Sequence, residues 1–189
     1  MKIVVLILVL TWSVEVTALI AILTKHYFVK NVIYHVFNIV QLILVTNFFL
    51  EINKPGHHKI LRRINYVIWP VLGTGNVVLF QPINGLNTNT LMLESFAVIS
   101  MSLWTIYVAL KQSDTTNIFN NLFFWVSFLL LIEWSSTFFF WAFVKLLNRN
   151  DWPYMKTATN ACNVINIITY TGIGIILLLS RKKTSIENI

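Results

Sequence analysis

Charged side chains are scarce in this sequence. Only 11% of its 189 residues are Asp, Glu, Lys or Arg, whereas soluble domains carry about 25%. A chain with so few charges cannot cover a water-facing surface, so the composition excludes a soluble globular protein. The 57% of hydrophobic residues and the mean hydropathy of +0.71 indicate an integral membrane protein instead.

Residues typical of metal and redox chemistry are equally sparse. The single cysteine, Cys162, excludes an internal disulfide and a cysteine-based zinc site. No His-x-x-x-His or Glu-x-x-His pair is present, so no metal site is predicted and any cofactor stays unidentified. The sequence also lacks Gly-x-Ser-x-Gly and His-Glu-x-x-His, which makes an enzyme the less favoured class without excluding it.

What the sequence does contain is long apolar runs, and there are six of them. They cover residues 3–24, 32–50, 66–80, 91–110, 121–147 and 158–180. A crossing needs about 20 apolar residues, so we predict an all-α integral membrane protein, a bundle of six transmembrane helices in one domain over residues 1–189. Five or seven helices are the alternatives.

Two of these runs have special features. The first is longer than the apolar core of a signal peptide, which has about 7–15 residues, and no small-x-small cleavage site follows it. We therefore expect a retained helix. The third run is short and contains Pro70, Gly73 and Gly75, which favour a kink or a locally unwound segment.

The basic residues predict the orientation. With the N-terminus inside, nine of the 14 Lys and Arg residues face the cytoplasm, as the positive-inside rule requires. We therefore expect both termini in the cytoplasm of a bacterium, on the inner face of its cytoplasmic membrane. The net charge of +7 gathers at helix ends, which suits anionic lipid better than nucleic acid. The residues expected to contact lipid head groups are Lys59, Arg62, Arg63, Arg181, Lys182 and Lys183.

Polar side chains inside the apolar runs are the candidates for function. A charged group at mid-membrane costs about 2.5–3.5 kcal/mol on insertion scales, and two acids lie deep in helices. Helical spacing gives each of these runs a polar face. The candidate ligand-binding or proton- and ion-linked residues are Glu15, His35, Asn38, Gln41, Glu133, Ser136, Thr137, Asn160, Asn163, Asn166 and Tyr170. The alternative is structural: protonated acids bonded across helix interfaces, and Asn contacts worth roughly 0.6 kcal/mol each.

Several short sequence segments resemble those of a family of small, multi-pass bacterial membrane proteins often encoded near sensor histidine kinases. They are Tyr34-His35-Val-Phe-Asn38-Ile-Val-Gln41-Leu, Leu93-Glu94-Ser95, Phe124-Trp125 and the Asn-rich stretch Asn160 to Asn166. The family has Glu where this chain has Gln41, and its members commonly have one more helix at the start, which would move the N-terminus to the other side. The resemblance implies a membrane component with a sensory role and gives no catalytic residue.

Three functions follow as hypotheses. The first is a membrane module that binds a small ligand or a partner in a polar interior, for sensing or signalling. The second is a small channel or the substrate-binding subunit of a transporter, and the third is a structural subunit of a larger complex. Membrane lipids, together with a protein partner or a second copy of the chain, are the expected partners.

Overall fold

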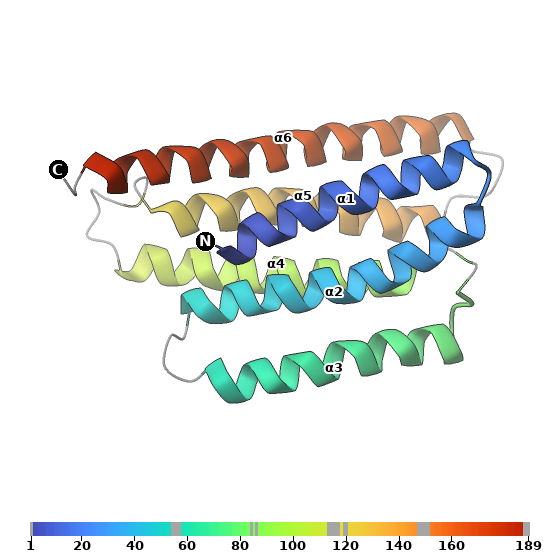
Figure 1. The fold of residues 1–189 in the computed structure, drawn as a ribbon, viewed down its shortest axis with the longest axis horizontal. Helices are drawn as coiled ribbons and strands as arrows, with labels where there is room; N and C mark the ends of the chain where they lie inside the picture. Colours follow the sequence, from blue (N-terminus) through green and yellow to red (C-terminus); the bar gives the residue numbers. More distant parts are fainter. Residues whose placement is uncertain are drawn as a thin grey trace. The chain divides into compact units, whose positions relative to one another are not determined.

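The computed structural model describes residues 2–53, 58–83, 85, 87–112, 118, 121–146 and 152–186. Within these ranges the regular structure is helical and no strand occurs (Figure 1). The helices are α1 (Lys2–Leu23), α2 (Tyr27–Asn53), α3 (His58–Leu79), α4 (Thr88–Gln112), α5 (Leu122–Leu146) and α6 (Trp152–Ile186). Five of these six, all but α3, are long and apolar enough to cross a membrane. The all-α multi-pass architecture predicted from the sequence is confirmed.

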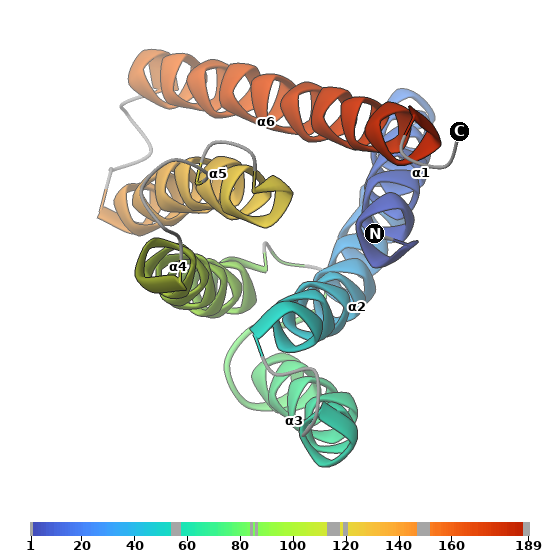
Figure 2. The ribbon, with the colours of Figure 1, turned by 90° about the vertical axis from the view of Figure 1, so that its left-hand side faces the viewer.

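The chain forms two compact units, residues Met1–Glu94 and Ser95–Ile189. Helix α4 contributes its first residues, Thr88–Glu94, to the first unit and the rest of its length to the second. In the first unit α2 lies between α1 and α3 and packs against both (Figure 2). In the second unit α5 packs against α6.

A tight turn joins α1 to α2. Lys25 adopts a left-handed backbone conformation with φ of 61°, and the backbone N–H of His26 donates to the Ala21 carbonyl at 2.8 Å. This closes the end of α1 and reverses the chain, so the two helices run antiparallel. Ala18 and Ala21 are buried, and such small side chains allow close helix approach.

Helix α3 is longer than the apolar run predicted. It begins at His58 and continues without interruption through Pro70, so the expected local unwinding is wrong. A proline removes one hydrogen bond, and the remaining bonds of this helix keep it continuous. The α2–α3 contact is close, because a Cβ atom added at Gly73 would meet the Ile39 side chain. The Asn65 Nδ2 atom also donates to the Ile43 carbonyl of α2 at 3.0 Å.

The second unit has its own close contact. A Cβ atom on Gly172 of α6 would lie 3.0 Å from the Leu129 Cδ1 atom of α5. Asn121 caps α5, with its Oδ1 atom accepting the Phe123 N–H at 2.9 Å. Helix α6 begins at Trp152, ahead of the predicted residue 158, since Pro153 lies in the first turn, where a missing N–H costs no intrahelical bond.

Candidate functional site

His35 is the central polar residue of α2. It is only 3% exposed, and its Nε2 atom lies 3.3 Å from the Gly85 carbonyl oxygen in the segment before α4. The Gly85 N–H in turn donates to the Pro82 carbonyl at 2.8 Å, which closes a tight turn. A side chain on an apolar helix therefore holds the connection between α3 and α4.

A network of amides and hydroxyls surrounds the same connection. We call it the loop cluster: Asn76, Gln81, Asn87, Thr88, Asn89 and Thr90. The Asn76 Nδ2 atom lies 3.2 Å from Gln81 Oε1, 3.4 Å from Asn87 Oδ1 and 3.1 Å from Thr90 Oγ1. Its Oδ1 atom accepts the Asn89 side-chain amide at 3.1 Å. Asn76 therefore joins the end of α3 to the beginning of α4.

Gln81 completes the loop cluster. Its Nε2 atom donates to Thr88 Oγ1 at 2.6 Å, and its Oε1 atom accepts the Asn89 backbone N–H at 3.1 Å. The second bond satisfies an N–H group in the first turn of α4, as a capping side chain does. The cluster holds the two helix ends with uncharged groups alone.

Two buried amide donors of the first unit, on Asn87 and Asn38, have no partner within the described residues. Asn87 is 6% exposed and Asn38, one turn along α2 from His35, is 2% exposed. The Nδ2 atom of each makes no hydrogen bond to the described part of the chain. Buried amides normally have a hydrogen-bond acceptor, so the first unit offers donors that an acceptor-bearing molecule can use.

Glu15 lies apart from this region. It is exposed on α1, and its Oε2 atom accepts the Tyr34 hydroxyl of α2 at 3.0 Å. The Lys30 Nζ atom lies 5.9 Å from the Tyr34 ring centroid. Of the predicted polar face on α2, His35, Asn38 and Gln41 are buried, while Tyr34 bonds to α1.

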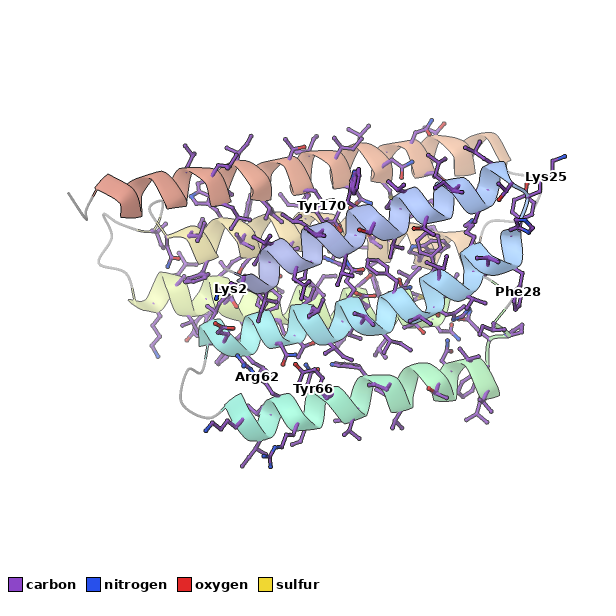
Figure 3. All side chains as sticks on the ribbon, in the orientation of Figure 1. Lys2, Lys25, Phe28, Arg62, Tyr66 and Tyr170 are labelled. Carbon is purple, nitrogen blue, oxygen red and sulfur yellow. The ribbon has the colours of Figure 1, made fainter. Side chains whose placement is uncertain are left out.

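Glu133 forms a second polar centre in the second unit. It is 3% exposed and is hydrogen-bonded to Tyr170 of α6, which lies midway along that helix (Figure 3). Ser136 donates its hydroxyl back to the Glu133 carbonyl at 2.7 Å, and the Cys162 thiol lies 4.0 Å from the Ser136 carbonyl oxygen. Thr137 is half-buried on the same helix. The predicted faces of α5 and α6 therefore meet at Glu133 and Tyr170.

The Asn-rich face of α6 is only partly buried. Asn166 and Tyr170 are half-buried, whereas Asn160 and Asn163 are exposed. A spacing of three residues is less than a full turn of about 3.6 residues, so each successive Asn is rotated around the helix axis relative to the one before it. Only the later members face α5.

The basic residues lie at helix ends, as predicted. In the first unit, Lys2 and Arg62 lie at one end, and Lys25 and Phe28 at the other (Figure 3). Lys59 and Arg63 are exposed, while Arg62 forms an ion pair with Glu51 at 3.2 Å. Helix α6 extends through Arg181, Lys182 and Lys183, whose side chains lie outside the described part of the chain.

The loop cluster is what sequence reasoning missed. Residues 81–90 read as an uncharged polar loop, and Asn76 as part of a short, irregular run. The available signal was the density of Asn, Gln and Thr between two apolar runs, in a loop free of Lys and Arg. In the parts of the chain that the structure describes, no group of three or more His, Cys, Asp and Glu side chains is placed to hold a metal ion.

Comparison of the chain with protein-family models, with curated proteins and with solved structures finds no match.

Proposed function

We propose that the chain is a multi-pass membrane module for sensing, and that its first unit binds a small ligand rich in hydrogen-bond acceptors. The observation that carries the proposal is the buried Asn87 Nδ2 donor, which has no acceptor within the described residues. It lies two residues from Gly85, whose carbonyl His35 contacts. Asn38 adds a second such donor on α2.

The chemistry of the region favours an uncharged polar ligand. The loop cluster consists of amides and hydroxyls, and it contains no Asp, Glu, Lys or Arg. Amide donors recognise carbonyl, amide and hydroxyl oxygens by geometry. A buried donor left unpaired costs about 1–3 kcal/mol, so a ligand that supplies the acceptor gains that energy on binding.

Asn87 also connects a ligand to the helices. Its Oδ1 atom lies 3.4 Å from Asn76 Nδ2 of α3, and its backbone carbonyl accepts the Leu91 N–H of α4 at 3.2 Å. A ligand that shifts Asn87 therefore acts on the end of α3 and the beginning of α4 together. Such a coupling is what a sensor requires, because binding must favour one arrangement over another.

The cellular setting belongs to the same proposal. The excess of basic residues supports a cytoplasmic N-terminus and C-terminus in a bacterial inner membrane. This orientation takes α3 as a sixth crossing, beside the five helices that are apolar enough to span a membrane, and it then places residues 80–87 on the outer side. The resemblance to proteins encoded near sensor histidine kinases agrees with sensing and with a membrane-bound protein partner. The ligand would then arrive from outside the cell.

The proposal is tested by ligand-induced stabilisation of the whole protein in lipid nanodiscs. A panel of sugars, nucleosides, amides and short peptides would be screened by the melting temperature, read from intrinsic tryptophan fluorescence. We expect at least one class of compound to raise the melting temperature in a saturable way, since a ligand that binds only the folded state stabilises the folded protein. The same compound, added outside sealed vesicles, should raise the melting temperature of the protein in right-side-out vesicles and leave it unchanged in inverted vesicles.

Two alanine variants make the test specific. For Asn87→Ala, the ligand concentration that gives half of the maximal stabilisation should rise by about tenfold, as the loss of one good hydrogen bond implies. Asn47→Ala is the matched control, because Asn47 is another buried α2 amide without a hydrogen bond to the described residues, nine residues along the helix from Asn38. A panel without any stabilising compound, or equal weakening in both variants, would count against the proposal.

A further inference from the structure

Glu133 is buried in an apolar part of the second unit and forms no ion pair within the described residues. It is the only Asp, Glu, Lys, Arg or His in the two membrane-spanning segments Leu122–Phe143 and Thr159–Leu179. An isolated carboxylate in such surroundings is strongly destabilised, so the group must hold a proton or a cation.

The neighbours of Glu133 offer oxygen atoms where a cation would be bound. Tyr170 hydrogen-bonds to the carboxyl group, while Glu133 Oε2 has no partner among the described residues. Asn166 Oδ1 is also buried, and it too lacks a donor in the described part of the chain. The α5–α6 pair therefore contains two buried oxygen atoms that can each accept a hydrogen-bonded proton or a cation.

Helical register brings these two oxygens to the same stretch of the interface. Tyr170 bonds to Glu133, and the Cys162 thiol lies 4.0 Å from the Ser136 carbonyl oxygen. Asn166 is one turn from both Cys162 and Tyr170, on the same side of α6. It therefore faces the segment of α5 between Glu133 and Ser136.

We propose that Glu133, Asn166 and Tyr170 form a binding site between α5 and α6 for a small cation, either a proton or Na⁺. As a proton site, the Glu133 carboxyl binds the proton on Oε2 and can donate the O–H to Asn166 Oδ1. As a Na⁺ site, the carboxylate and the amide carbonyl supply oxygen ligands of the kind that hard cations take. Both cations neutralise the same buried charge.

Few other groups can titrate near this site. Among the described side chains of α6, the titratable ones next to this stretch of α5 are Tyr170, which bonds to Glu133, and Cys162, which lies against the Ser136 carbonyl. Helix α4 contributes none from Ser95 to Ala109, where the sequence has no Asp, Glu, Lys, Arg, His or Cys and the only Tyr, Tyr107, is exposed. A response to pH or Na⁺ at this depth would therefore report Glu133. The site uses no residue of the first unit, so its test is independent of the ligand proposed there.

The experiment is carbodiimide labelling of the intact protein in liposomes, read by mass spectrometry of the peptide that contains Glu133. A hydrophobic carbodiimide adds to a protonated carboxyl in an apolar site. We expect labelling to fall as pH rises, because only the protonated carboxyl reacts. For a Na⁺ site, NaCl should also protect Glu133 at fixed pH, and KCl at the same ionic strength should not. Protection by pH alone identifies the proton as the cation.

Variants of the neighbours separate a cation site from a structural acid. Asn166→Leu and Tyr170→Phe should move the half-labelling point by about one pH unit or tenfold in Na⁺ concentration. Thr171→Val is the matched control, because Thr171 is exposed beside Tyr170 on the same helix, and it should leave that point unchanged. Labelling that stays constant with pH and NaCl, or is absent throughout, would overturn the proposal.

Discussion

The two units place polar groups in their membrane-spanning helices in different ways. In the first, many uncharged side chains bond to one another around Asn76, and Asn38 Nδ2 and Asn87 Nδ2 are buried donors without a partner in the described residues. In the second, the buried acid Glu133 lies on α5, and its Oε2 atom and Asn166 Oδ1 of α6 are buried acceptors without a partner in the described residues. Unpaired donors suit a ligand with acceptors, whereas unpaired acceptors suit a cation. This contrast is the basis for proposing different ligands for the two units.

The difference extends to how each unit is held together. The first unit joins α3 to α4 by a network in which each member has several partners, so its loss should be cooperative. The second unit joins α5 to α6 by apolar packing and the bond from Tyr170 to Glu133. Substitution of a polar side chain with several hydrogen-bond partners should therefore lower the free energy of unfolding most in the first unit.

The largest effect is expected for Asn76→Leu. The change removes the four side-chain contacts that Asn76 makes with Gln81, Asn87, Asn89 and Thr90. Since each buried polar group left unpaired costs about 1–3 kcal/mol, the free energy of unfolding should fall by about 2–3 kcal/mol. Unfolding by a denaturing detergent, titrated into mixed micelles, measures the change.

Its control is Thr74→Leu, at an exposed position two residues earlier in α3. That variant should remain near the parent stability. Equal losses in both would mean that the loop cluster contributes little beyond the helix itself.

The sequence predicted the helices far better than the sites. Apolar runs reveal membrane helices because lipid demands a continuous apolar surface, and the buried face of His35, Asn38 and Gln41 followed from helical spacing. The loop cluster did not follow, because its bonds join residues up to 14 positions apart through a turn. Periodicity carries no information about such contacts. Glu15 was predicted to face the interior because it lies deep in an apolar run, but it is exposed. The sequence does not reveal which face of α1 packs against α2.

A smaller effect is expected for Gly73→Val at the α2–α3 contact. The added Cβ would meet the Ile39 side chain, and overpacking of this kind costs about 1–3 kcal/mol. Gly75→Val is the control within the same helix, because a Cβ there meets no atom within 4 Å. Hydrogen exchange of the α3 amides should rise in the first variant and not in the second. Similar exchange in both would argue that α3 does not depend on its close approach to α2.

The smallest effect is expected for Gly172→Val, which makes the equivalent change in the second unit. Its added Cβ would lie 3.0 Å from Leu129 Cδ1, the end of a side chain that can turn to another rotamer. The loss of stability should therefore be below about 1 kcal/mol, the lower limit for overpacking. The control is Gly174→Val, where the added atom meets nothing within 4 Å. Exchange of the α5 and α6 amides measures both. A loss as large as that of Gly73→Val would show that α5 and α6 are packed as rigidly as α2 and α3, and that the units differ in their polar chemistry alone.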